Sequence, residues 1–195
     1  MKVNPVLLGL VITAGLALAV AGTGLFTRPY VFHGSLIDPP VPAVDFALTD
    51  QFGQPFHLSQ QTGNVVLLFF GYTSCPDECP ATLAQLKQVR AQLGNQAERV
   101  RVVFITVDPE QDTQEHIGEF LARFDPAFTG LTGSTAELEP VWRSYGVYQA
   151  KRTELVEHTS RIYAIDPRGN LRLTYPIETS DNDLARDIQQ LLKGS

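Results

Sequence analysis

Two cysteines close together are the residues of this chain with the clearest chemical potential. Cys75 and Cys79 lie in the segment GYTSCPDECP, and the 195 residues contain no other cysteine. On a helix, the spacing i, i+4 puts both sulfur atoms on one face, one turn apart. There the two thiols can share a metal ion or oxidise to a disulfide. A purely stabilising disulfide is the weaker interpretation, because a bridge that closes so short a loop constrains the unfolded chain little.

The position of the pair along the chain favours metal or redox chemistry. Both cysteines follow the apolar run VVLLFFG at 65–71 and precede a helical pattern that begins at Pro80. The carboxyl end of a strand in an α/β sheet is where ligands commonly bind. The dipole and the unpaired N–H groups at a helix N-terminus favour the thiolate, so we expect the pKa of these thiols to lie below the usual value of about 8.5.

The four histidines are the candidates for a third metal ligand. His158 lies in VEHTSRIYAID, in a loop just before a predicted strand, where it can lean over a neighbouring helix N-terminus. Two thiolates and one imidazole suit copper, as Cu(I) or Cu(II). Zinc is not excluded, because Asp77 or Glu157 can supply the fourth ligand of a closed site. The other three histidines are expected to be solvated surface residues: His33, His57 and His116.

The elements that must position these residues alternate between strands and helices. An unbroken apolar run predicts a buried strand over 65–71, and the largely apolar VRVVFITV predicts a second one over 100–107. Apolar stripes at helical spacing predict helices over 80–93 and 113–124, and a further helix after Ser134. The intervening VDPEQDT is interpreted as a loop and helix start with Asp112 or Thr113 as N-cap, in preference to a partner contact.

Two predicted hairpins and a last helix complete the predicted domain. Residues 45–58 alternate apolar and polar around a turn, which predicts an N-terminal β-hairpin extension. RIYAI at 161–165 and LRLTY at 171–175 flank strong turn signals, and Ser180 opens a final helix. The pattern predicts an α/β fold, a mixed sheet flanked by helices.

The first 28 residues predict a transmembrane anchor helix. The apolar run over 6–26 carries no charge and is long enough to cross a bilayer as a helix of about 20 residues. Lys2 precedes the run, so the positive-inside rule places the rest of the chain on the outer face of the cytoplasmic membrane. A cleaved signal peptide over 1–28 is the alternative, because Ala19-Val20-Ala21 matches the small-residue pattern of a processing site.

Beyond the anchor, the composition predicts a tether followed by one acidic domain. Residues 29–44 contain Pro39, Pro40 and Pro42, and we expect them to form a Pro-rich tether before the domain at 45–195. The chain has 15 Lys and Arg against 21 Asp and Glu, and removing Lys2 and Arg28 leaves 13 basic and 21 acidic side chains, a net charge of −8. A domain this acidic is a poor match for nucleic acid.

The chain resembles the Sco (SCO/SenC) family of membrane-tethered copper proteins, which have a thioredoxin-like fold and help to assemble the CuA centre of cytochrome c oxidase. The resemblance rests on GYTxCPDxCP followed later by HTS, a highly specific combination. The matching segments run in family order from about residue 30 to the C-terminus: FHG, DFALTD, VVLLFFGYTSCPDECPATL, VVFITVDPEQDT, FDPAFTGLTG, YGVY, EHTSRIYAID and LRLTYP.

The resemblance implies a copper metallochaperone with Cys75, Cys79 and His158 as the copper ligands. It implies that the CuA-bearing subunit of cytochrome c oxidase receives the copper, with other copper chaperones or thiol reductants as further candidate partners. Glu157 departs from the family pattern, which more often has Asp before the ligand His, so a fourth-ligand role for Glu157 stays open. We expect Asp77 to cap the following helix by accepting N–H bonds.

Other functions remain compatible with the same residues. A thiol-disulfide oxidoreductase can use Cys75 and Cys79 as a redox pair that reduces a partner's disulfide. No Pro stands directly before 161–165, where thioredoxins have a cis-Pro, which counts against general oxidoreductase work. A peroxidase of the peroxiredoxin type is disfavoured because both cysteines lie in one motif, and a redox or copper sensor is not excluded. We therefore expect a copper chaperone rather than an enzyme.

Overall fold

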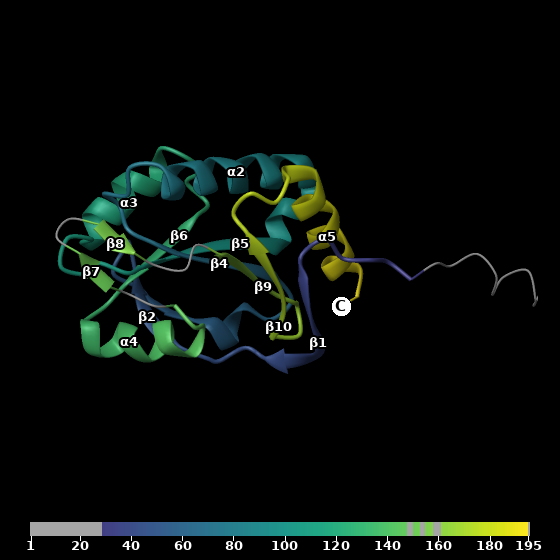
Figure 1. Cartoon of the computed structure of the whole chain (residues 1–195), viewed down its shortest axis with the longest axis horizontal. Helices are drawn as coiled ribbons and strands as arrows, with labels where there is room; N and C mark the ends of the chain where they lie inside the picture. Colours follow the sequence, from purple (N-terminus) through teal and green to yellow (C-terminus); the bar gives the residue numbers. More distant parts are fainter. Residues whose placement is uncertain (1–28, 148–149, 153–154, 158–160, 195) are drawn as a thin grey trace, which may run out of the picture. The chain divides into compact units, whose positions relative to one another are not determined.

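A mixed β-sheet forms the centre of the domain. The computed structural model describes residues 29–147, 150–152, 155–157 and 161–194, and a compact unit begins at Phe32. Within these ranges eight strands pair in the order β1-β10-β9-β4-β5-β6-β2-β3 (Figure 1). β5 is parallel to both of its neighbours, β4 and β6, and the other pairs are antiparallel. The strands are β1 (Ser35–Pro42), β2 (Ala47–Asp50), β3 (Pro55–His57), β4 (Val65–Gly71), β5 (Val100–Thr106), β6 (Thr129–Thr132), β9 (Arg161–Ile165) and β10 (Asn170–Pro176).

Helices cover both faces of this sheet. α2 (Glu78–Leu93), α3 (Gln114–Ala122) and α5 (Asp181–Lys193) lie on one face, and α4 (Thr135–Ser144) lies on the other (Figure 1). Alternate side chains of β4 enter the two hydrophobic cores between these layers, and every residue of β4 is buried. A strand covered on both faces needs no polar side, which explains the unbroken apolar run in the sequence.

Shorter elements connect or flank these layers. Two 3₁₀ helices, η1 (Leu58–Gln61) and η2 (Gly94–Arg99), precede β4 and β5. β7 (Ala150–Arg152) and β8 (Leu155–Glu157) pair with each other in a separate small sheet. β8 therefore ends at Glu157, and β9 begins at Arg161.

Most of the predicted elements are confirmed. β4 has the predicted bounds, and α2 begins two residues earlier than predicted, at Glu78. The predicted hairpins correspond to β2–β3 and to β9–β10. Ser180 caps α5, since its side chain accepts the Asp183 N–H. The mixed sheet flanked by helices is thus the architecture that the sequence predicts.

The expectation of a tether over 29–44 is wrong for most of that segment. Ser35–Pro42 is the edge strand β1 and pairs with β10, with an irregularity between Leu36 and Val41 where the Asp-Pro-Pro sequence lies. Proline cannot donate to a strand ladder, but an edge strand with an irregular register tolerates it. The domain therefore begins before residue 45.

The predicted anchor over 1–28 lies outside the described residues. Among the helices that the structure does describe, none is long and apolar enough to span a bilayer.

Candidate metal centre

The two cysteines lie at the junction between β4 and α2. The backbone N–H of Cys79 points at Cys75 Sγ, with a nitrogen–sulfur distance of 3.4 Å. Both side chains are free thiols. Because α2 begins at Glu78, only Cys79 of the two is helical. Cys75 lies in the preceding loop, where its N–H donates to the Tyr72 carbonyl at 3.2 Å. The pair is therefore close together, although its geometry is that of a loop and a first helical turn rather than of one helix face.

The environments of the two thiols differ. Cys79 is fully buried in the core between β4 and α2, whereas Cys75 is half-buried and packs against the edges of both hydrophobic cores. Of the two thiols, that of Cys75 is therefore the more exposed.

The expectation of a lowered pKa is wrong for Cys79. Burial raises the pKa of the Cys79 thiol far above its ordinary value, and the hydrogen bond with the Tyr72 backbone opposes this only in part. Desolvation of a charged sulfur outweighs the helix dipole at this position. Burial therefore favours the neutral thiol of Cys79 at physiological pH, and a metal ion that bound this sulfur would displace its proton.

Gly71 makes the position of Cys79 possible. A Cβ at residue 71 would lie 2.8 Å from Cys79 Sγ and 2.8 Å from Cε2 of Phe104. The sulfur of Cys79 thus packs directly against the backbone at the end of β4. The sequence shows Gly71 only as the end of a strand, and no local pattern indicates this contact.

Asp77 does not act as the cap that the sequence predicts. It occupies the N-cap position of α2, but its side chain makes no capping hydrogen bond, and its carbonyl accepts the Ala81 N–H at 3.1 Å. The exposed carboxylate of Asp77 is consequently not committed to the helix.

The cap of α3 is Thr113, one of the two predicted candidates. Its hydroxyl accepts the backbone N–H of His116 at 3.2 Å. The other candidate, Asp112, is fully buried and contacts Thr73 in the loop that leads to Cys75. A contact between residues so far apart in the sequence is not visible in the local pattern.

The four histidines lie in different surroundings. His57, the last residue of β3, is half-buried rather than fully solvated. His158 lies outside the described residues, so its role as a ligand stays a prediction, as does that of Glu157. His116 is an exposed residue, as expected. His33 is not simply solvated, because its Nδ1 lies 3.0 Å from Asp187 Oδ1 and its Nε2 lies 3.3 Å from Asp183 Oδ1. Among the residues that the structure describes, no three His, Cys, Asp or Glu side chains gather into a metal-binding cluster.

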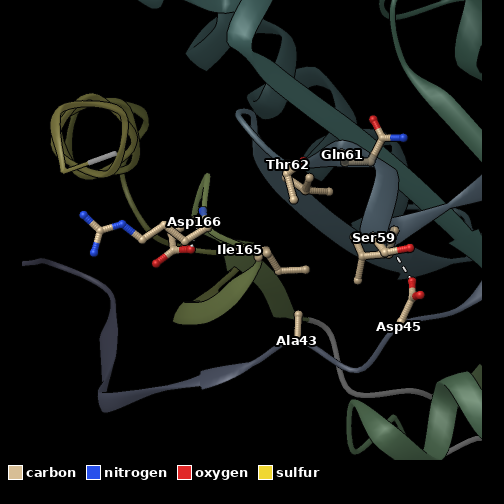
Figure 2. A pocket seen from close by; sticks show the side chains of 11 residues that line it. Ala43, Asp45, Ser59, Gln61, Thr62, Ile165 and Asp166 are labelled. Carbon is tan, nitrogen blue, oxygen red and sulfur yellow. Dashed lines mark hydrogen bonds between the residues drawn. The ribbon is translucent and has the colours of Figure 1, made fainter.

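A cavity elsewhere in the domain does not involve the cysteines. It has a volume of about 210 Å³ and lies between η1 and the turn that joins β9 to β10 (Figure 2). On its wall, Ser59 N–H donates to Asp45 Oδ1 at 2.9 Å, and Asp166 lies on the opposite side (Figure 2). Neither Cys75 nor Cys79 lines it. The chemistry of the cysteine pair is therefore separate from this cavity.

Most of the sequence matches one known family. A family model described as SCO1/SenC matches residues 38–193. The chain belongs to the SCO1/SenC family. A SCO2-like protein of Rickettsia felis is 33% identical over 158 residues, which cover 77% of this chain and 75% of that protein.

Solved Sco structures share the fold. Copper-bound ScoI of Bradyrhizobium japonicum is 34% identical, with a TM-score of 0.71 over 77% of this chain and 99% of that one. The solution structure of apo Sco1 from Thermus thermophilus is 37% identical, with a TM-score of 0.77 over 85% of this chain and 99% of that one. The predicted thioredoxin-like α/β fold is thereby confirmed.

Proposed function

We propose that this SCO1/SenC protein is a copper metallochaperone that binds one copper ion through Cys75 and Cys79. His158 is proposed as the third ligand from the sequence motif alone. The CuA-bearing subunit of cytochrome c oxidase is proposed as the recipient during assembly of the oxidase. The observation that carries this function is the pair of adjacent free thiols at the β4–α2 junction, one fully buried and one half-buried. A relative of this chain, ScoI, has been solved with copper bound.

The donor set suits the proposed cargo. Thiolates select Cu(I), and thiolates with an imidazole also accommodate Cu(II). Two thiolates carry a charge of −2, so their complex with Cu(I) has a net charge of −1 and their complex with Cu(II) is neutral. The imidazole of His158 is neutral and would add a donor atom without changing that charge. The apolar surroundings of Cys79 keep water away from its sulfur, which favours a soft metal–sulfur bond over a hydrated ion.

The unequal burial of the two thiols supports one order of ligand exchange. Copper from a donor meets the half-buried Cys75 first, and Cys79 then replaces a ligand of the donor and releases its proton. A thiolate of the recipient approaches from the same open side, so exchange toward the recipient also begins at Cys75. The buried Cys79 holds the ion while the outer ligands change.

Copper titration of single variants tests the proposal. We expect one copper per wild-type protein, loss of tight binding in Cys75→Ser and in Cys79→Ser, and weakened binding in His158→Ala. His116→Ala is the matched control, because His116 is exposed and its Nδ1 lies 2.9 Å from the Gln111 carbonyl oxygen, away from the cysteine pair. Wild-type stoichiometry and affinity in both serine variants would exclude the pair as the copper site. For delivery, the CuA spectrum of the oxidase should be lost on gene deletion and should not be rescued by Cys75→Ser.

We further propose that residues 1–28 anchor the chain in the cytoplasmic membrane, with the domain on its outer face. The support is the uncharged apolar run over 6–26. Extraction of membranes at high pH tests it, since an anchored chain stays in the pellet. Release of a chain shortened at its N-terminus, seen by mass spectrometry, would instead favour the cleaved signal peptide.

Thiol-disulfide exchange is the second candidate function, favoured by the closeness of the two free thiols. The thiolate of Cys75 would attack a partner's disulfide to form a mixed disulfide, and Cys79 would then displace the partner's second thiol. The partner would gain two electrons, and a Cys75–Cys79 disulfide would form. A His158→Ala variant that still supports oxidase assembly fully would favour this function, because the exchange needs no imidazole ligand.

A further inference from the structure

Asp112 contacts the loop that carries Cys75. Its side chain is fully buried. Its Oδ1 accepts the hydroxyl of Thr73 at 2.5 Å, and both carboxylate oxygens lie within hydrogen-bond distance of the Thr73 backbone N–H, at 3.1 and 3.2 Å. Thr73 stands two residues before Cys75 in the sequence. The backbone and the side chain of this loop residue are thus both held by one carboxylate.

The other side of Asp112 is fixed to the sheet. Thr106, the last residue of β5, donates its hydroxyl to Asp112 Oδ2 at 2.6 Å, and the same hydroxyl accepts the Asp108 N–H at 2.9 Å. Thr132, the last residue of β6, donates its hydroxyl to the Asp112 carbonyl at 3.2 Å. With both oxygens engaged, the carboxylate cannot turn away from Thr73 without leaving a buried group unpaired. The loop is therefore tied to the carboxyl ends of two strands.

Helix capping does not account for this aspartate. Thr113 already caps α3, so the helix needs no carboxylate from its neighbour. Burying a carboxylate is costly, and burial raises the pKa of Asp112 despite its hydrogen bonds to Thr106 and Thr73. The buried carboxyl group of Asp112 instead joins Thr73 of the loop to Thr106 at the end of β5, and this bridge orients the loop.

Thr73, which Asp112 holds, is linked to both thiols by short contacts. Thr73 adjoins Tyr72, whose carbonyl accepts the Cys75 N–H, and Cys75 Sγ in turn accepts the Cys79 N–H. A shift of the loop at Thr73 therefore moves Cys75 Sγ relative to the rigidly buried Cys79.

We propose that Asp112 is a positioning residue that holds Thr73 and so sets the position of Cys75 Sγ relative to Cys79 Sγ for copper. This inference rests on the proposed copper function. Residues that orient the ligands of a metal typically change its affinity by about 10–100-fold when they are replaced.

Substitutions at Thr73 give the sharpest test. Thr73→Val keeps the shape and removes the hydroxyl that donates to Asp112, whereas Thr73→Ser restores the hydroxyl. Thr82→Val is the matched control, because Thr82 lies in α2 close to Cys79 and its buried hydroxyl has no hydrogen-bond partner among the described residues. Thr73→Val should lower copper affinity about tenfold and shift the sulfur-to-copper charge-transfer band, and Thr73→Ser and Thr82→Val should resemble the wild type.

A second readout needs no copper. In metal-free protein with Cys79→Ser, Cys75 is the only thiol, so its alkylation by iodoacetamide reports on the loop alone. Thr73→Val and Asp112→Ala should each raise the rate several-fold, because a released loop opens more readily, and Asp112→Asn, which keeps an acceptor for Thr73, should raise it less. If the wild-type protein binds no copper, the copper function fails while the alkylation rates still decide the positioning role.

The inference would be overturned if Thr73→Val had the same copper affinity, charge-transfer band and alkylation rate as the wild-type protein. Equal losses in Thr73→Ser and Thr73→Val would also overturn it, because the hydroxyl would then not be the group that matters. Thr73 is only half-buried, so these variants stay informative even if Asp112→Ala does not fold.

Discussion

Replacing Gly71 by alanine tests how tightly the buried cysteine is held. The added Cβ would lie 2.8 Å from Cys79 Sγ, 2.8 Å from Cε2 of Phe104 and 3.3 Å from Cε1 of Phe69. These three side chains are fully buried, so none can move into solvent to make room. Gly71 lies in β4 without a left-handed backbone conformation, so the strain comes from these contacts and not from the backbone.

The expected cost follows from the number of close contacts. One extra methyl group in a packed core costs about 1–3 kcal/mol of unfolding free energy. Because two of the three contacts are shorter than Cβ atoms normally make, we expect the upper part of that range, about 2–3 kcal/mol. Copper affinity should fall as well, because Cys79 Sγ must move away from its place beside Cys75.

Urea unfolding of the metal-free protein, followed by the fluorescence of the buried Trp142, measures this cost. Gly118→Ala in α3 is the matched control, since its Cβ would approach only the Gln51 side chain, at 3.7 Å, and a helical alanine should stabilise by about 0.5–1 kcal/mol. In a Cys79→Ala background the cost of Gly71→Ala should shrink, because one of the two closest contacts is gone. A Gly71→Ala protein within about 0.5 kcal/mol of the wild type would refute the packing argument.

Two further predictions concern the N-terminal segment and the buried thiol. Asp187 is fully buried and accepts hydrogen bonds from the N–H groups of His33 and Gly34 and from the hydroxyl of Tyr175. Asp187→Ala should therefore lower the free energy of unfolding in urea by about 3 kcal/mol or more. A decrease below about 1 kcal/mol would show that these groups find other partners. Burial raises the pKa of Cys79, so its proton competes with copper at neutral pH and apparent copper affinity should rise about tenfold per pH unit for this one proton. Competition titrations with a copper chelator at several pH values measure that slope, and an affinity independent of pH would mean that Cys79 binds copper without losing a proton.

Local sequence patterns predict the centre of the fold because its elements are locally consistent. The apolar run at Val65–Gly71 predicts β4 with its observed bounds. The predicted turn between β9 and β10 is likewise confirmed. Such features depend on a few neighbouring residues, so a single sequence is sufficient to find them.

The elements missed by the sequence depend on distant partners. β6 has only four residues, and its Gly130 is required because a Cβ would collide with Ile117 and Leu121 of α3. β1 contains three prolines, and its pairing with β10 outweighs their local preference. Neither the collision nor the pairing can be read from neighbouring residues.

In the candidate site, too, some features follow from neighbouring residues and others depend on distant contacts. The closeness of Cys75 and Cys79 follows from their spacing, whereas the raised pKa of Cys79 depends on the surrounding core. The contact of Asp112 with Thr73 joins segments 39 residues apart. Chemistry set by burial or by such distant contacts requires the three-dimensional structure.

X-ray absorption at the copper edge tests the central claim most directly. The copper-loaded wild-type protein should show two sulfur ligands and one imidazole nitrogen, with one sulfur lost in Cys79→Ser and the imidazole lost in His158→Ala. A spectrum of the wild-type protein without sulfur ligands, or one that Cys79→Ser leaves unchanged, would contradict a copper site built on Cys75 and Cys79.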